Sequence, residues 1–200
     1  MDLSALSLKF AFLLGTTLIS QVRAQEYHTP TKKSYSANQV IEGINEQMLI
    51  IASSSKSVFL NDKPIFVPLI FSESVDNNIF ASRIKTLAPP KKFYVIVRNL
   101  CAARQPGVTY GIYLNQPTKE SLKNNSPYYV GDLNFYNAVI AANCISVKNS
   151  KFFSFNVTNL LKDLQVRKLL KEQITLTISP EGTPEIQANP VIGQIELVEQ

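Results

Sequence analysis

Histidine is the residue whose count says most about the chemistry open to this chain. The 200 residues contain one histidine, His28, close to the start. A zinc hydrolase site or a pair of copper ions needs several imidazoles, and a Ser-His-Asp relay needs one imidazole held in a core. Aspartates and glutamates are present, but none falls in a recognisable catalytic motif. We therefore expect neither an enzyme nor a protein that holds a metal or another cofactor.

The two cysteines, Cys101 and Cys144, are the next candidates for chemistry. Each lies beside or within a segment that reads as a strand. In an oxidising compartment they could form one disulfide, which would close a loop of about 40 residues and stabilise the fold by roughly 4 kcal/mol. Two separately buried thiols, packed as small apolar side chains, are the alternative. Both remain open, because the sequence does not give the Cα separation that decides between them.

Five tyrosines gather on three neighbouring segments that read as strands. Tyrosines that point outward would suit a binding face, because tyrosine is enriched at the centres of protein interfaces. Ordinary packing between neighbouring strands is the alternative, and it is the interpretation we favour. The candidates for a binding face are Tyr110, Tyr113, Tyr128, Tyr129 and Tyr136.

Residues 1–24 predict export. Lys9 gives a weakly positive start, residues 10–19 are apolar but too few to span a bilayer, and Ala24 suits a cleavage site. An uncleaved N-terminal anchor is the alternative. We expect a signal peptide and release into the periplasm or the extracellular space. No later stretch reaches the roughly 18 apolar residues of a spanning helix, so we expect no membrane span after cleavage.

The charge of the chain is mildly basic and spread along it. The formal net charge is +5, and the tightest basic groups are only Lys32-Lys33 and Lys91-Lys92. A nucleic-acid-binding face would gather such residues together with aromatic ones. We therefore expect no nucleic acid as a partner and assign the excess to solvation of the surface.

The chain after the signal peptide divides into a leading arm and one β domain. Residues 25–56 are polar and partly irregular, and 39–51 could form a short helix. From residue 57 to 200, short apolar stretches alternate with proline-rich and asparagine-rich turns, which predicts an antiparallel β-sandwich of about 7–8 strands. The predicted strand regions are 57–60, 65–71, 75–85 (the weakest), 93–100, 108–115, 128–136, 151–156, 174–179 and 191–198.

One short helix is predicted near residues 159–171. Thr158 is placed to act as the N-cap, since its hydroxyl can accept from free amides of the first turn. Leucines then follow at roughly helical spacing, which predicts one apolar face. They are Leu160, Leu161, Leu164, Leu169 and Leu170.

Several segments from residue 93 onward follow one another in the order found in a known module. The segments are PGVTYGIYLN (106–115), PYYVGDLNFY (127–136), FNVTNLL (155–161), ITLTI (174–178) and PVIGQIE (190–196). They resemble the β-sandwich domain that follows the dicopper domain in tyrosinases and polyphenol oxidases. Weaker similarity around Val58 and 64–69 extends the resemblance to about 140 residues.

The resemblance implies a fold and a binding role, but no oxidase activity. In this family the chemistry lies in a separate helical domain whose histidines bind two coppers, and this sequence lacks that domain. The module itself lies against the catalytic domain and can cover the entrance to the copper site. We therefore expect an exported, non-catalytic binding domain that shields a secreted tyrosinase-like copper oxidase or assists its maturation. The alternative is a structural or adhesive component of the cell envelope with no link to copper chemistry.

Overall fold

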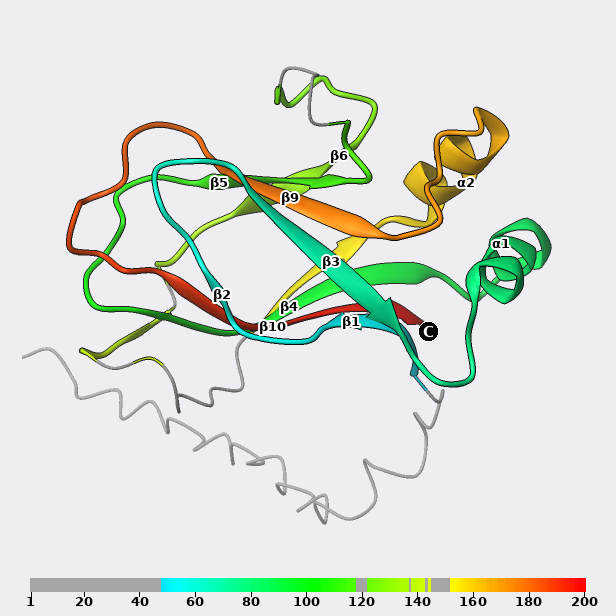
Figure 1. Cartoon of the computed structure of the whole chain (residues 1–200), viewed down its shortest axis with the longest axis horizontal. Helices are drawn as coiled ribbons and strands as arrows, with labels where there is room; N and C mark the ends of the chain where they lie inside the picture. Colours follow the sequence, from blue (N-terminus) through cyan, green and yellow to red (C-terminus); the bar gives the residue numbers. More distant parts are fainter. Residues whose placement is uncertain (1–47, 118–121, 137, 143, 145–151) are drawn as a thin grey trace, which may run out of the picture. The chain divides into compact units, whose positions relative to one another are not determined.

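A computed structural model describes residues 48–117, 122–136, 138–142, 144 and 152–200, which hold ten strands and two helices (Figure 1). The predicted signal peptide, His28 and most of the leading arm lie outside these residues. In chain order the elements are β1 (Leu49–Ser54), β2 (Val58–Phe59), β3 (Ile65–Phe71), α1 (Asn77–Thr86), β4 (Phe93–Ala102), β5 (Tyr110–Leu114), β6 (Tyr129–Leu133), β7 (Val139–Ile140), β8 (Phe152–Asn156), α2 (Thr158–Val166), β9 (Thr175–Pro180) and β10 (Val191–Glu199).

Strand β3 belongs to both halves of the sheet. Its residues 65–68 pair with β9, whereas residues 69–71 pair with β1 on the opposite edge. The order across the sheet is β6-β5-β9-β3-β1-β10-β4-β7, with β2 also beside β10 and β8 also beside β4. Every pair is antiparallel except β4 with β7. The mainly β fold predicted from the sequence is confirmed, with ten strands instead of seven or eight.

The core lies between the two halves of the sheet, which nearly meet again at their far ends (Figure 1). A Cβ on Gly131 of β6 would lie 2.7 Å from a ring carbon of Phe155 of β8, so these two strands touch there. The φ angle of Gly131 is 156°, which favours glycine on its own account. The largest fully buried side chains include Tyr110, Tyr113, Phe80, Phe93, Phe135, Ile51 and Leu69.

The central pair β4–β10 contains an inversion of the side-chain pattern. Val97 and Leu100 both belong to the core although they are three residues apart, whereas residues on one face of a strand are two apart. The alternation of side chains is interrupted at Asn99, whose φ angle is 56°. Gly193 of β10 lies beside it, and a Cβ there would lie 2.6 Å from the Cβ of Asn99. Beyond the inversion, Cys101 points away from the core.

Helix α1 occupies a segment for which the sequence predicts a strand, so the assignment of 75–85 was wrong. Asp76 is the N-cap, and its Oδ1 accepts from the backbone N–H of Ile79 at 2.7 Å. Phe80 and Ile84, one helical turn apart, are both buried in the core. The four-residue spacing of Phe80 and Ile84 therefore indicates a helix, although the β-branched residues of this segment favour a strand.

The start of helix α2 differs from the predicted cap. Helical geometry begins at Thr158 itself, and the N-cap residue is Val157, whose side chain makes no capping hydrogen bond. The Thr158 Oγ1 instead accepts from the backbone N–H of Phe93 at 2.9 Å, which ties the helix to the first residue of β4. The Thr158 N–H donates to Asn156 Oδ1 at 3.0 Å.

Helix α2 ends five residues earlier than predicted. Lys168 has a φ angle of 58°, its N–H donates to Gln165 O at 3.0 Å, and the Leu169 N–H donates to Leu164 O at 2.8 Å. These bonds form a Schellman motif, which usually carries glycine at the left-handed position. Because the residue here is lysine, the end of the helix could not be predicted from the sequence. Leu169 still packs against the core, but from outside the helix.

The β structure also begins earlier than predicted, because β1 lies within the segment assigned to the leading arm. A bulge between Ile50 and Ala52 turns both Ile51 and Ala52 into the core. The strict alternation that identifies a strand is thereby lost. Ile50, on the outer side, is exposed.

We expect Gly193→Ala to lower the free energy of unfolding by roughly 1–3 kcal/mol, because the new methyl group would overlap the Cβ of Asn99. Urea unfolding of the purified chain measures this. The matched background is the variant Asn99→Gly, which lacks the Cβ that the new methyl group would overlap. In this background Gly193→Ala should lower the free energy of unfolding much less. An equal cost in both backgrounds would contradict the explanation.

Candidate functional site

Three of the five tyrosines proposed for a binding face are buried. Tyr110, Tyr113 and Tyr128 are each at most 3% exposed, so they cannot form a binding face. The Tyr110 ring packs edge-on against Phe135, with ring centroids 5.7 Å apart. Burial raises the pKa of Tyr110 to about 12, so its phenol stays protonated. The packing interpretation is therefore the correct one for these three residues.

The other two tyrosines reach the surface to different extents. Tyr129 is half-buried beside Tyr113, with ring centroids 5.6 Å apart, and its phenol hydrogen-bonds to Asp132. Burial and this carboxylate raise the pKa of Tyr129. Burial, with Glu181 next, also raises the pKa of Tyr113. Tyr136 alone is well exposed, at 74%, and it lies apart from the others beyond the end of β6.

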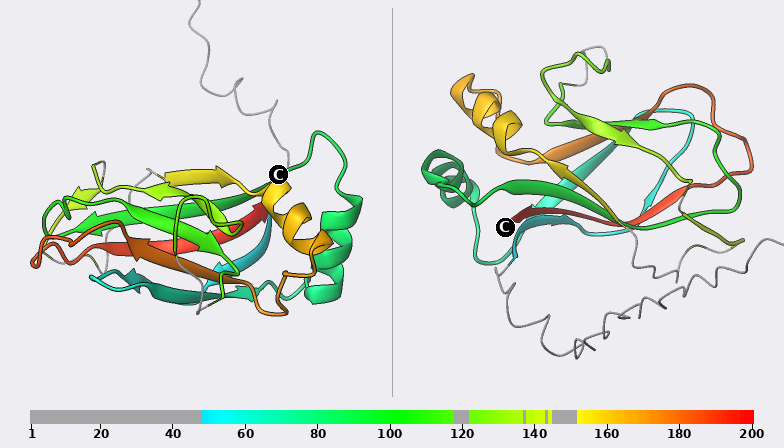
Figure 2. Two further views of the ribbon diagram at one scale, coloured as in Figure 1. Left: turned by 90° about the horizontal axis from the view of Figure 1, so that it is seen from above. Right: turned by 180° about the vertical axis from the view of Figure 1, so that it is seen from behind.

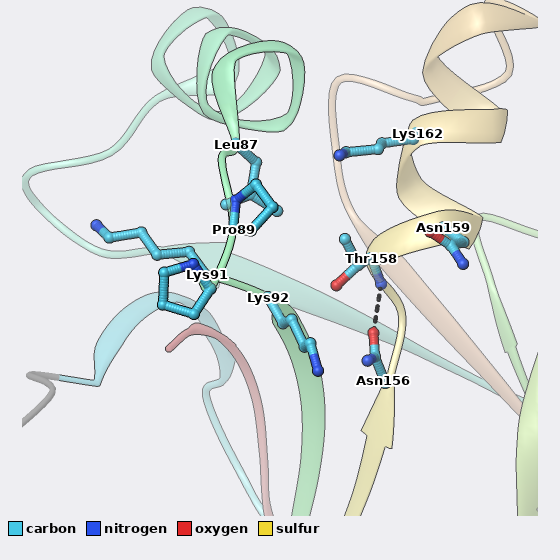
Figure 3. A pocket seen from close by; sticks show the side chains of 9 residues that line it. Leu87, Pro89, Lys91, Lys92, Asn156, Thr158, Asn159 and Lys162 are labelled. Atoms are coloured by element: carbon cyan, nitrogen blue, oxygen red, sulfur yellow. Dashed lines mark hydrogen bonds between the residues drawn. The ribbon is translucent and has the colours of Figure 1, made fainter. Parts of the chain in front are cut away.

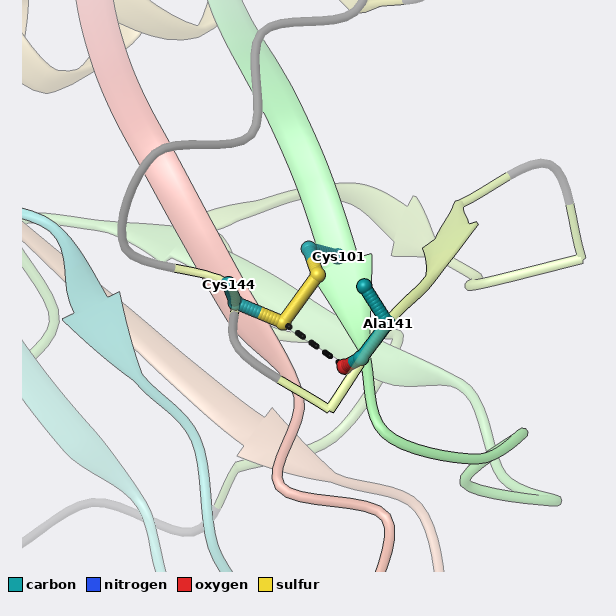
Figure 4. The surroundings of a disulfide bond; sticks show 3 residues. All are labelled: Cys101, Ala141 and Cys144. Carbon is teal, nitrogen blue, oxygen red and sulfur yellow. Dashed lines mark hydrogen bonds between the residues drawn. A yellow bond between two sulfur atoms is a disulfide. The ribbon is translucent and has the colours of Figure 1, made fainter.

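The structure joins Cys101 and Cys144 in a disulfide (Figure 4). Their Cα atoms lie 5.6 Å apart, within the range that a disulfide allows. The inversion at Asn99 turns Cys101 outward, toward the segment that follows β7. The Cys144 Sγ also lies 3.8 Å from the carbonyl oxygen of Ala141. Of the two alternatives that the sequence left open, the bridge is the one present.

Large apolar side chains point outward from β2 and β3. Phe59 is 60% exposed, Phe66 is 46% exposed and Ile70 is 57% exposed, and Pro68 between the last two is exposed as well. We call these four residues the β2–β3 apolar surface. Contiguous exposed apolar groups of this kind mark sites where proteins bind other molecules. The sequence analysis missed this surface, because a strand that is apolar on both faces reads as fully buried.

A groove of about 320 Å³ runs between β2 with its preceding loop and the first half of β3. Three members of the β2–β3 apolar surface, Phe59, Phe66 and Pro68, line it. Lys56 is the one charged residue in the lining, and within the described part of the chain it has no carboxylate partner. The remaining lining residues are Ser54, Ser55, Ser57, Val58, Ile65 and Val67.

A second cleft, of about 360 Å³, lies at the end of the sandwich where the two helices meet (Figures 2 and 3). The Gln165 side chain on α2 donates to the backbone oxygen of Ala81 on α1 at 2.7 Å and holds the helices together. Three lysines line the cleft and no acidic residue does. In Figure 3 the Lys162 side chain extends from α2 toward the loop of Leu87 and Pro89. The lining is Leu87, Pro89, Pro90, Lys91, Lys92, Asn156, Thr158, Asn159 and Lys162.

Glu199 fixes the loop beside this cleft. Its carboxylate oxygens lie 3.0 Å from Arg83 Nη1 on α1 and 3.0 Å from Lys91 Nζ, and its side chain is only 6% exposed. Burial alone would raise the pKa of Glu199, but the hydrogen bonds and charges of Lys91 and Arg83 outweigh it and hold the pKa below its usual range. The carboxylate is therefore charged at neutral pH and joins α1 to the start of β4.

Within the described residues, no three histidine, cysteine, aspartate or glutamate side chains come together as metal ligands would. The described helices are all too short or too polar to cross a bilayer.

Comparison with known proteins gives matches in structure only. No known protein family matches the sequence, and no curated protein matches it. The structure is similar to recombinant latent aurone synthase, a polyphenol oxidase, at 13% identity and a TM-score of 0.43 over 72% of this chain and 25% of that one. It is also similar to latent apple tyrosinase, at 11% identity and a TM-score of 0.39 over 74% of this chain and 26% of that one.

Both similar structures belong to the class of enzymes that the five sequence segments resemble. The chain spans about a quarter of the length of either enzyme. The activity of those enzymes is a property of the longer chains. The proposals below are argued from the residues of this one.

We expect reduction of the Cys101–Cys144 disulfide to lower the free energy of unfolding by about 2–4 kcal/mol, because it closes a loop with a sequence separation of 43. Urea unfolding with and without dithiothreitol measures the difference. The control is the double variant Cys101→Ala/Cys144→Ala, whose stability should not respond to the reductant. Unchanged stability of the wild type on reduction would contradict the prediction.

We expect Glu199→Gln to destabilise the protein at pH 7 by roughly 1–3 kcal/mol, because Arg83 and Lys91 lose a charged acceptor. The pKa of Glu199 is lowered on folding, so its contribution is complete above the unfolded-state pKa and is lost as the pH falls through the folded-state pKa. The difference from wild type should therefore shrink between pH 5 and about pH 3. Urea unfolding at each pH tests this.

The control for that series is Glu185→Gln, which changes an exposed carboxylate that has no ion pair within the described residues. It should leave the stability at pH 7 within about 0.5 kcal/mol of wild type. If Glu199→Gln behaved in the same way, the ion pairs of Glu199 would be unimportant for stability.

Proposed function

We propose that this protein is an exported, non-catalytic binding domain that docks on a partner protein through the β2–β3 apolar surface. The observation that carries the proposal is the exposure of three large apolar side chains, Phe59, Phe66 and Ile70, on β2 and β3, two of which line one groove. Aromatic and aliphatic side chains left in water on a rigid sheet contribute free energy when a partner covers them, at about 25 cal/mol per Å² of apolar area. A sheet face also holds them in place, so little conformational entropy is lost on binding.

The partner that we favour is a secreted dicopper oxidase of the tyrosinase type. The five ordered segments that resemble the family's β-sandwich module support this choice. In this proposal the domain lies against a separate oxidase chain, shields its copper site or assists its maturation, and leaves the redox chemistry to it.

The disulfide supports a place of action outside the cytoplasm. Disulfides persist in the periplasm and in the extracellular space, and they are rare in reducing cytosol. Cys101 and Cys144 are the two cysteines of the sequence, and the bridge uses both. This agrees with the export that residues 1–24 predict.

Titration of a purified tyrosinase-type oxidase with this protein tests the proposal. We expect saturable binding by calorimetry and a change in the rate of phenol oxidation on binding. The variant Ile70→Ser, in the β2–β3 apolar surface, should weaken binding roughly tenfold, which corresponds to about 1.4 kcal/mol.

The matched control is Ile186→Ser, because Ile186 is also an exposed isoleucine, at 91%, but lies in the loop before β10. It should bind the oxidase as the wild type does. Absence of binding to any tyrosinase-type oxidase would end the oxidase version of the proposal. Binding to isolated envelope polymer instead would favour a structural or adhesive role.

A further inference from the structure

We infer that the groove between β2 and β3 binds an extended peptide segment of a partner protein, which adds to the edge of β3 as a further strand. The inference rests on the proposed binding function and gives it a mode of recognition. It depends on three features: an open backbone edge, an apolar lining and one unpaired positive charge.

The open edge results from Pro68. The N–H of Leu69 donates toward Ile174 at the start of β9, whereas the N–H of Ser72 donates to Ile51 O of β1, so alternate residues of β3 face opposite edges. Residues 66, 68 and 70 therefore face the β1 side. Proline has no N–H, so the ladder to β1 cannot continue past Leu69, which is the last residue of β3 that pairs with it.

Beyond this point the β1 side of β3 has no partner strand among the described residues. Phe66 pairs with β9 on its other side, through Thr177, while its own N–H and C=O face the groove. The carbonyl oxygen of Pro68 still belongs to the β1 ladder, because the pairing of Ser54 with Leu69 places it opposite Ser55. Phe66 thus offers one donor and one acceptor, and an antiparallel peptide residue opposite it could make two hydrogen bonds with it.

Strand β2 presents a second edge across the groove. The N–H of Leu60 donates to Pro190 O beside β10, so the backbone of the preceding residue, Phe59, faces away from β10. Phe59 also lines the groove. An inserted segment would therefore have backbone groups of β3 on one side and of β2 on the other, with the rings of Phe59 and Phe66 beside its own side chains.

The charge of the groove predicts one further property of the bound peptide segment. Lys56 is the one charged side chain in the groove lining and has no carboxylate partner within the described residues. The fitting partner is an extended peptide that alternates apolar side chains and carries an acidic residue near Lys56. A volume of about 320 Å³ suits a short segment of this kind, because it lies at the small end of the range for ligand sites.

Amide hydrogen exchange of the full chain tests the inference. The probe is the synthetic peptide acetyl-Glu-Val-Thr-Val-Thr-Val-amide, which has alternating apolar residues and one carboxylate. We expect saturating probe to slow exchange of the Phe66 amide by on the order of tenfold, because that N–H becomes hydrogen-bonded. The Val67 amide, which faces β9, serves as an internal control and should not change.

A second probe carries N-methyl groups on its valine amides and keeps every side chain. It should give no protection of Phe66, since it cannot donate to the edge. The variant Lys56→Glu should weaken the first probe roughly threefold to tenfold, whereas Lys63→Glu, in the turn outside the groove, should not.

Equal protection by the N-methylated probe, or no protection of Phe66 at millimolar probe, would overturn the inference. These measurements contain no oxidase, so they separate the inference from the proposed function. Protection of Phe66 without oxidase binding would retain the groove as a peptide site and remove the oxidase as its partner. Oxidase binding without protection of Phe66 would retain the proposed function and remove strand addition.

Discussion

The missing N–H of Pro68 is the constraint on which the open edge of β3 and the groove beside it depend. With an N–H at this position, β1 could follow β3 along its whole length. The ladder between β3 and β1 stops at Leu69, and β3 pairs with β9 along its opposite edge over residues 65–68. The chain after β1 continues along β10, where it forms β2 beside Val191 and Ile192. The groove between β2 and β3 lies beside the part of β3 that β1 leaves without a neighbour.

A second local irregularity lies in the central pair of strands, β4 and β10. Asn99 and Gly193 let β4 and β10 reverse their side-chain pattern at the same point, so the two strands stay paired on both sides of the step. The reversal keeps Leu100 in the core and turns Cys101 out of it. The disulfide then connects β4 to the segment after β7. An irregularity in two strands thus decides where the covalent link lies.

The sequence predicts best those elements whose pattern is regular. Strand β4 was expected over 93–100 and extends from Phe93 to Ala102, and the mainly β class is confirmed. The elements that were missed each depart from the regular pattern of their type. The bulge at Ile51 hides β1, and the buried pair Phe80 and Ile84 makes a helix of a segment with strand propensity. Helix α2 ends just before Lys168, which adopts a left-handed backbone conformation; a glycine at this position would have predicted the end of the helix.

The same distinction explains why the sequence analysis named tyrosines as candidates for a binding face and did not name the β2–β3 apolar surface. Tyrosines drew attention because their chemistry suits interfaces, but Tyr113 lies over Gly111, which leaves room for its ring on the sheet. The residues left outside are Phe66 and Ile70, in a segment so apolar that it reads as buried on both faces. The apolar character of a strand does not show whether its outer face is covered by other residues or exposed, because apolar residues occur on both kinds of face. What distinguishes them here is the loss of a neighbouring strand at Pro68, and that loss leaves both an apolar face and an unpaired backbone edge at one place.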